Sequence, residues 1–299
     1  MSSTTALIHV VIGPTASGKS SYALEKASQY DGVIINCDAM QSYDALHVLT
    51  AQPGQEEQSQ ALHRLYGHLH PNTSYSAAAW RHDAVKEIGN AWNNNQTPIL
   101  CGGTGFYLKA LMEGLSPIPD ADDDIRQQAI KLMDEIGIEA FHTLLKEKDP
   151  DTAAQIDPMN KQRNMRAWEV LTQTGKGLST WQKEPLETPS SDWDFHVTAL
   201  FPNRESLIEK INNRLETMIN HGILDEVRAL DNLIQSGEVA ENALIVKAHG
   251  FRPFRRYLNG EWTIDEAITQ TQTETRQYAK RQMTWLRNQL NIDEIIEIN

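Results

Sequence analysis

The first third of the chain alternates short apolar segments with longer amphipathic ones. Residues 7–12, 33–36 and 98–101 are almost continuously apolar and rich in β-branched side chains. Strands covered on both faces have this pattern, whereas half-exposed strands alternate apolar and polar residues. Between them, helical spacing predicts helices over residues 21–29, 77–90 and 106–113. This order predicts an α/β doubly wound fold, with a parallel sheet core flanked by helices.

A second region follows a break at Pro117 and Pro119. From there to about residue 189 the apolar residues have helical periodicity, and no segment resembles a strand convincingly. We therefore expect an inserted all-helical subdomain at residues 116–189, within a core built from residues 1–115 and 190–299. A last strand is predicted at residues 195–200, followed by helices at 204–220, 223–235 and 264–289.

Composition is typical of a globular protein, with 40% hydrophobic and 22% charged residues. No segment approaches the roughly 20 apolar residues that cross a bilayer, and the first residues lack the pattern of a signal peptide. The two cysteines, Cys37 and Cys101, each end an apolar run. This favours buried, reduced thiols over a disulfide framework. We expect a cytoplasmic protein without a membrane anchor.

The net charge of −13 argues by itself against a nucleic-acid partner, because such proteins gain affinity by neutralising phosphates. The charge is unevenly distributed, however. Acidic residues concentrate at 120–124 and 293–297, whereas segments 161–183 and 247–287 contain more basic than acidic residues. A local basic surface is compatible with this distribution, and so is a set of solvated helix faces.

A phosphate-binding motif follows the first predicted strand. It matches GxxxxGK[ST] between a strand and a helix, and consists of Gly13, Pro14, Thr15, Ala16, Ser17, Gly18, Lys19 and Ser20. Glycines let the loop approach phosphate oxygens, while backbone N–H groups and Lys19 supply positive potential. Ser20 offers a ligand for Mg²⁺. The motif predicts a phosphate or diphosphate ligand without specifying a nucleotide.

Two further segments belong to the same predicted edge of the sheet. Asp38 follows the second strand directly, and residues 102–105, with the sequence Gly-Gly-Thr-Gly, follow the third. Open α/β sheets bind ligands at the carboxyl ends of their strands. We therefore interpret Asp38 as a proton acceptor or magnesium ligand rather than only a helix cap. The second glycine-rich turn, with the Thr104 hydroxyl, would form another wall of the site.

With these segments in view, the sequence resembles the tRNA dimethylallyltransferases, also called isopentenyl-tRNA transferases, over nearly its whole length. The resemblance is carried by the phosphate-binding motif, by Asp38-Ala39-Met40-Gln41-Ser42-Tyr43, by Gly102-Gly103-Thr104-Gly105-Phe106-Tyr107, by residues 162–170 (QRNMRAWEV), by 222–228 (GILDEVR) and by 275–282 (TRQYAKRQ). Many relatives have Ser at position 39 and several have Arg at position 40, whereas this chain has Ala39 and Met40.

The resemblance implies a loop that grips the diphosphate of dimethylallyl diphosphate instead of ATP. It implies that Asp38 contacts the adenine amine as general base, and that Thr15 and Arg214 stabilise the leaving group. It further implies that the helical insertion embraces the anticodon stem-loop. The tRNA contacts implied are Asp38, Ala39, Met40, Gln41, Thr104, Arg126, Gln162, Arg163, Asn164, Met165, Arg166, Lys247, Arg252, Gln277 and Arg281.

The activity implied is transfer of a dimethylallyl group to the adenosine immediately 3′ of the anticodon, in tRNAs reading codons that begin with U. The enzyme would be a monomer that uses Mg²⁺. A neutralised diphosphate leaves an allylic carbon readily, and Asp38 would accept the proton of the weakly nucleophilic adenine amine. The base would have to be turned out of its stack. Two alternatives use the same loop: a transferase acting on small molecules, either a kinase or an enzyme prenylating free adenine nucleotides, and a nucleotide-dependent switch.

Overall fold

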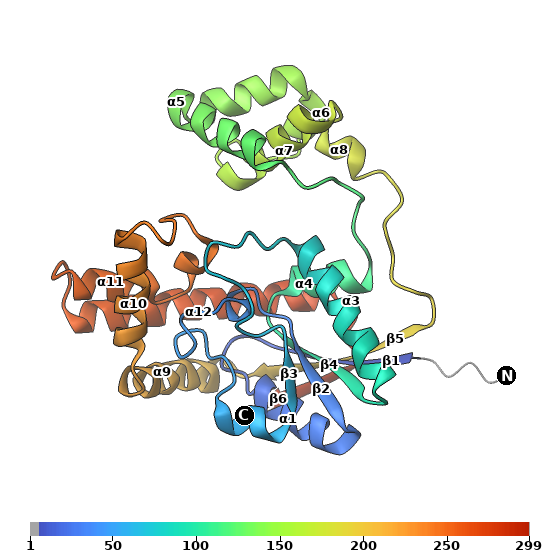
Figure 1. The fold of residues 1–299 in the computed structure, drawn as a ribbon, viewed down its shortest axis with the longest axis vertical. Helices are drawn as coiled ribbons and strands as arrows, with labels where there is room; N and C mark the ends of the chain where they lie inside the picture. The colour runs from blue at the N-terminus through green and yellow to red at the C-terminus, as the bar shows by residue number, and fades with distance from the viewer. Residues whose placement is uncertain (1–5, 299) are drawn as a thin grey trace. The chain divides into compact units, whose positions relative to one another are not determined.

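Six parallel strands form one sheet in the computed structural model, which describes residues 6–298 (Figure 1). Their order across the sheet is β3-β2-β4-β1-β5-β6. The strands are β1 (Ala6–Ile12), β2 (Gly32–Asn36), β3 (Leu62–Arg64), β4 (Thr97–Gly102), β5 (Trp193–Pro202) and β6 (Glu294–Ile298). The predicted parallel α/β fold is confirmed. The prediction that the strand at 195–200 is the last one is wrong, because β6 pairs with β5 after the final helix.

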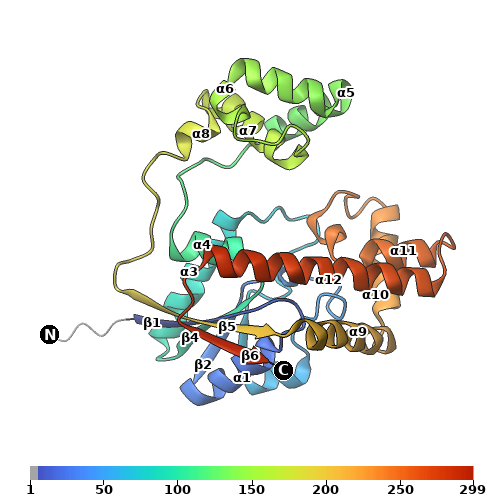
Figure 2. The same cartoon turned by 180° about the vertical axis from the view of Figure 1, so that it is seen from behind.

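Helices cover both faces of the sheet, as its apolar strands require. Val10, Ile12 and Leu100 face a large core, where they pack with apolar side chains of the helices on that side. These helices are α3 (Ala77–Asn93), α4 (Gly105–Met112), α9 (Arg204–Asn220), α10 (Ile223–Gln235), α11 (Phe251–Leu258) and α12 (Ile264–Gln289). Val11 and Ile99 face the opposite side, where they pack with Ala23 and Ala27 of α1 (Lys19–Tyr30). Figure 2 shows α12 lying along the sheet, on the side away from α1.

The three long helices near the carboxyl terminus begin and end where the sequence predicts. α9 (Arg204–Asn220) begins after Asn203, whose side chain accepts a hydrogen bond from the Ser206 N–H. α12 begins after Thr263, which forms a capping box with Glu266. These side chains satisfy backbone N–H groups that have no partner within the helix. The sequence prediction missed α11, which is only eight residues long.

Residues Glu113–Pro189 form a compact unit separate from the rest of the chain. Its helices are α5 (Asp123–Lys148), α6 (Pro150–Ala153), α7 (Lys161–Thr174) and α8 (Leu178–Trp181). Leu145, Ile156 and Ala167 belong to its own small core. The described residues of this unit contain no strand, and α5 is interrupted at Gly137, where φ is 77°.

Cys37 and Cys101 are free and buried, which confirms their predicted state. Among the described residues, no helix is both long and apolar enough to span a membrane.

Two glycines offer a matched test of this packing. A Cβ at Gly102 would lie 2.1 Å from the Cys37 carbonyl oxygen, whereas a Cβ at Gly89 of α3 would meet nothing within 4 Å. We expect Gly102→Ala to lower the free energy of unfolding by about 1–3 kcal/mol through steric strain. Gly89→Ala should raise it by about 0.5–1 kcal/mol, because alanine is the better helix former. Denaturant titration measures both changes, and an equal effect of the two variants would contradict the close approach.

Candidate active site

Residues 13–20 join β1 to α1 through a tightly turned loop. Ala16 and Gly18 have left-handed backbone conformations, with φ of 62° and 86°, and the Ser17 N–H donates to the Pro14 carbonyl at 3.2 Å. Left-handed residues in such a turn direct successive N–H groups inward, which makes an anion-binding concavity. The Ser17 hydroxyl is buried and has no hydrogen-bond partner among the described residues. The loop therefore combines the geometry of an anion cradle with an unpaired buried donor.

Lys19 brings a positive charge to this loop. Its side chain is partly buried, and its ammonium donates to the Pro14 carbonyl at 3.4 Å. Burial lowers the pKa of Lys19, while the neighbouring Cys101 and Asp38 act in the opposite direction. Ser20 is exposed in the first turn of α1. Its hydroxyl is thus accessible at the mouth of the loop.

A second cation reaches the loop from α9. The Arg214 guanidinium donates to the Thr15 hydroxyl oxygen at 2.5 Å, across 199 positions of sequence. Burial lowers the pKa of Arg214, and the Asp38 carboxylate opposes this shift. Two cations and one carboxylate are thus close enough to influence one another. The sequence predicted all three as site residues, and the structure brings them together with Thr15.

Asp38 lies where the chain leaves β2. Its carboxylate is partly buried, and Oδ1 accepts a hydrogen bond from the Met40 N–H at 3.0 Å. The described residues provide no hydrogen-bond donor to Oδ2. One carboxylate oxygen thus orients the group, and the other is free to accept a proton or a ligand.

Asn36 fixes the backbone of Asp38, a role that the sequence did not reveal. Its side-chain carbonyl accepts the Asp38 N–H at 2.8 Å, and its amide donates to the Asp38 carbonyl at 2.9 Å. The same amide donates to the Leu65 carbonyl at 2.9 Å and lies 3.1 Å from the Ser42 hydroxyl. Asn36 is fully buried. The polar end of an otherwise apolar strand was the available signal.

The loop after β4 packs directly on the Asp38 segment. The Thr104 N–H donates to the Cys37 carbonyl at 3.1 Å, and the Thr104 hydroxyl accepts the Ala39 N–H at 3.0 Å. Thr104 therefore supports the segment that carries Asp38. The hydroxyl proton of Thr104 remains available to donate in the predicted contact with tRNA.

The other predicted tRNA-contacting residues of the core differ in their exposure to solvent and in their hydrogen bonds. Ala39, Met40 and Gln41 are partly buried. The Gln41 amide donates to the Thr50 and Ala51 carbonyls, both at 2.8 Å, which leaves its oxygen available. By contrast, four residues near α11 and α12 are exposed: Lys247, Arg252, Gln277 and Arg281.

His249 lies among these exposed residues. Its ring centroid is 4.7 Å from that of Tyr278, and Nδ1 lies 3.9 Å from a Glu274 carboxylate oxygen. Burial lowers the pKa of His249, with Arg281 acting in the same direction and Glu274 and Asp38 acting against it. The sequence prediction did not identify this pair of rings.

On the helical unit, the predicted residues Gln162 and Arg163 are exposed on α7, and Met165 is partly buried. Asn164 is fully buried instead. Its side-chain oxygen accepts a hydrogen bond from His142 Nδ1 at 2.8 Å, and its amide nitrogen donates to three backbone carbonyls. The Asn164 side chain therefore holds the start of α7 in place, and its contact with tRNA stays a prediction.

Two more predicted tRNA-contacting residues pair within the helical unit. Arg126 and Arg166 lie 3.8 and 3.9 Å from the carboxylate oxygens of Glu169, and Arg166 also donates to the Pro119 carbonyl at 3.1 Å. Burial raises the pKa of Glu169, while both arginines lower it. Arg126 and Arg166 thus have a structural role, whether or not they also contact a ligand.

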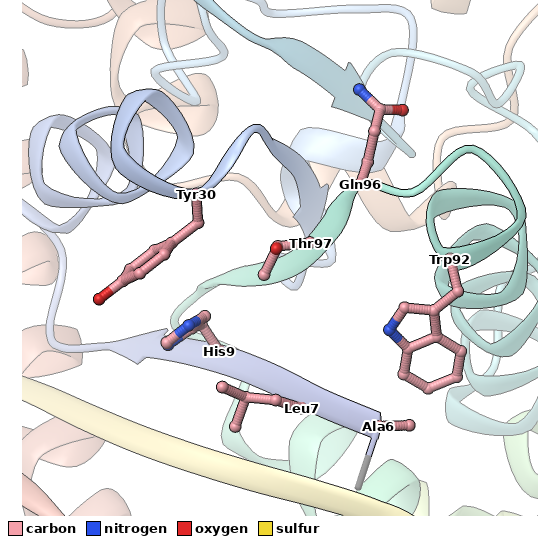
Figure 3. A pocket seen from close by; sticks show the side chains of 7 residues that line it. All are labelled: Ala6, Leu7, His9, Tyr30, Trp92, Gln96 and Thr97. Atoms are coloured by element: carbon pink, nitrogen blue, oxygen red, sulfur yellow. The ribbon is translucent and has the colours of Figure 1, made fainter. Parts of the chain in front are cut away.

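A cavity of about 370 Å³ lies elsewhere, at the amino ends of the strands (Figure 3). Ala6 of β1 and Thr97 of β4 line it together with the rings of His9, Tyr30 and Trp92. Ligands of open α/β sheets bind at the opposite, carboxyl ends. The cavity is therefore separate from the loop, the cations and Asp38.

The fold and this constellation define an α/β protein with a glycine-rich loop after its first strand, two cations at that loop and a carboxylate close to them. The family model described as IPP transferase matches residues 41–289. The chain is 45% identical to the tRNA dimethylallyltransferase of Paramagnetospirillum magneticum, over 97% of this chain and 90% of that protein.

Solved structures agree. The full-length tRNA isopentenylpyrophosphate transferase of Bacillus halodurans is 30% identical, with a TM-score of 0.67 over 98% of this chain and 90% of that one. A eukaryotic dimethylallyltransferase acting on tRNA has the same fold, with a TM-score of 0.83 and 23% identity over 97% of this chain and 73% of that one. The chain belongs to the IPP transferase family and is a prenyl-group transferase.

Asn36→Ala tests how strongly the site depends on one buried amide. The substitution leaves the Asp38 N–H without a partner, and a buried unpaired group costs about 1–3 kcal/mol. It also removes the hydrogen bonds from the Asn36 amide to the Asp38 and Leu65 carbonyls. We expect the free energy of unfolding to fall by about 2–4 kcal/mol, measured by denaturant titration. Asn90→Ala, at an exposed position of α3, is the control and should change it by less than about 0.5 kcal/mol. Similar values for the two variants would show that the Asn36 bonds contribute little.

Proposed function

We propose that the protein transfers the dimethylallyl group of dimethylallyl diphosphate to the exocyclic amine of an adenosine in tRNA. The acceptor is the adenosine immediately 3′ of the anticodon, in tRNAs that read codons beginning with U. The observation that carries the proposal is that Lys19 and Arg214 bond to Pro14 and Thr15 of the loop, with the Asp38 carboxylate near enough to influence both cations. The names of the similar proteins support the same donor group and acceptor.

In this mechanism the loop N–H groups, Lys19 and Arg214 bind the diphosphate. The bond between the first allylic carbon and oxygen breaks, and its electrons pass to the leaving diphosphate, whose charge the two cations stabilise. The amine nitrogen of adenine forms the new bond to that carbon. The proton of the amine passes to Oδ2 of Asp38. The Met40 N–H orients this carboxylate by donating to its other oxygen, Oδ1. Thr15, which is hydrogen-bonded to Arg214, would also contact the leaving diphosphate.

Mg²⁺ would be held by Ser20 together with the diphosphate. This ion takes few protein ligands and is completed by substrate phosphates and water. The exposed Ser20 in the first turn of α1 fits this arrangement. When bound, the ion would add positive charge at the leaving diphosphate.

The proposal extends to the partners and the setting of the enzyme. The helical unit would contact the anticodon stem-loop through the exposed face of α7, and the core would contribute Lys247, Arg252, Gln277 and Arg281. The enzyme would act as a monomer in the cytoplasm, where Cys37 and Cys101 stay reduced.

The decisive assay incubates the protein with dimethylallyl diphosphate, Mg²⁺ and unmodified tRNA, and then examines the digested nucleosides for dimethylallyladenosine. Parallel reactions with free AMP as acceptor, and with ATP in place of the allylic donor, test the two small-molecule alternatives. Product from AMP but not tRNA, or nucleotide hydrolysis alone, would contradict the proposal.

In this assay Asp38→Ala should lower kcat by about 10² to 10⁴-fold, the usual contribution of general-base catalysis. It should leave the Kd for tRNA nearly unchanged, and a loss of tRNA binding without a loss of kcat would refute the assigned role.

The tRNA contact of α7 has its own test. Arg163→Gln should weaken tRNA binding and flatten its dependence on salt, because each lost phosphate contact reduces the slope by about 0.7–0.9. Arg163 suits this test better than Arg166, whose guanidinium also bonds within the unit. Lys131→Gln, an exposed residue of α5, is the charge-matched control. A salt titration of tRNA affinity with coincident lines for the native protein and Arg163→Gln would remove Arg163 from the interface.

A further inference from the structure

Gln282 is a buried polar side chain between the two glycine-rich loops of the site. It lies on α12 and is 6% exposed. Its side-chain carbonyl accepts the Thr15 N–H at 2.9 Å, and its amide donates to the Gly103 carbonyl at 3.0 Å. One side chain thus connects the diphosphate loop to the loop after β4, across 267 and 179 positions of sequence.

The two bonds require an amide at this position. A donor must face the Gly103 carbonyl and an acceptor must face the Thr15 N–H, and glutamine supplies both with fixed spacing. A carboxylate would direct an oxygen toward the Gly103 carbonyl oxygen, and an apolar side chain would leave both backbone groups unpaired. Residue 103 must also be small, because a Cβ there would lie 2.2 Å from Gln282 Nε2.

Gln282 and Arg214 hold Thr15 from two sides. Gln282 takes its N–H, while Arg214 donates to its hydroxyl oxygen at 2.5 Å. A hydroxyl that accepts from one partner still has its own proton to donate. Thr15 is therefore fixed with a hydrogen-bond donor available, before any ligand arrives.

We propose that Gln282 is a positioning residue for dimethylallyl transfer. It does not touch the substrate. It holds the Thr15 segment of the loop at a fixed separation from the loop after β4, so that the donors around the leaving diphosphate need not rearrange during the reaction. The inference rests on the proposed function, because the leaving diphosphate is what the positioned groups would stabilise.

Gln282→Met removes both hydrogen bonds to the loops, and the side-chain hydrogen bond with Tyr278, at nearly constant volume. We expect kcat to fall about 10- to 100-fold, since small displacements of positioning groups have effects of this size. The affinity for inorganic diphosphate, measured by calorimetry, should fall about tenfold, the equivalent of roughly one net hydrogen bond. The Kd for tRNA should not change. Gln270→Met, at an exposed position of the same helix, is the matched control and should keep native kcat.

Gln282→Glu gives a signature that a general loss of packing would not give. Burial raises the pKa of such a carboxyl, and the cations Arg214 and Lys19 at the same loop act in the opposite direction. Its protonated form can donate to the Gly103 carbonyl while accepting from Thr15. The ratio of variant to native kcat should therefore rise as the pH falls from about 8 to about 6. The same ratio for Gln282→Met should stay level. Gly103→Ala, which displaces the amide, should resemble Gln282→Met.

The outcomes separate the two proposals. A native protein that forms no dimethylallyladenosine refutes the proposed function, while the calorimetric comparison still tests the positioning of the loop. An active native protein refutes the positioning role if Gln282→Met keeps kcat within twofold, or if the Gln282→Glu ratio does not change with pH. If Gln282→Met fails to fold, the pH response of Gln282→Glu decides the question alone.

Discussion

The carbonyl oxygen of Cys37 occupies the space where a side chain at position 102 would begin. The separation of 2.1 Å from a hypothetical Cβ means that the chains leaving β2 and β4 touch through their backbones. This contact continues the register in which Asn36 pairs with Cys101, and two further bonds, from Cys37 N–H to Cys101 and from Thr104 N–H to Cys37, extend it beyond the strands. Asp38 is thereby held beside the loop that follows β1. The position of the carboxylate follows from backbone contact and not from its own side-chain bonds alone.

The charges of the site follow from this enclosure. The protein has a net charge of −13, yet Lys19 and Arg214 place two positive charges around one loop. Burial lowers the pKa values of Lys19 and Arg214. Because burial also partly excludes water, the attraction of these two cations for an anion is less screened. Asp38 offsets part of the cost of burying them. A diphosphate arriving at the loop would meet cations whose positions are already fixed, so overall net charge says little about this ligand.

Much of the fold could be predicted from sequence because the signals are local. The strand, loop and helix at residues 7–29, and the caps of α9 and α12, are each encoded within a few residues. β3 and β6 were missed because they are short edge strands, and the exposed, acidic segment of β6 resembles a charged tail.

In the site, Lys19, Asp38 and Thr104 follow strand ends and could be found. Asn36 had only its polar character at the end of an apolar strand as a signal, and Gln282 had no local signal, since its two bonds join it to loops far away in the sequence. Asn164 was expected to contact tRNA, and its side chain is fully buried, a difference from the exposed Arg163 beside it that no local pattern indicates.

The strained part of the loop shows why distant helices are needed to complete the site. Ala16 has a left-handed backbone, with φ of 62°, a conformation that costs a residue with a Cβ about 1–3 kcal/mol. Such strain persists only where the surroundings over-determine it. Here Ala16 packs against Leu207 and Ile211 of α9 and Ala279 of α12. The same two helices supply Arg214 and Gln282 to the adjacent Thr15. The local sequence of the loop therefore encodes its turn, while α9 and α12 hold the loop in this conformation through residues that lie 199 and 267 positions further along the chain.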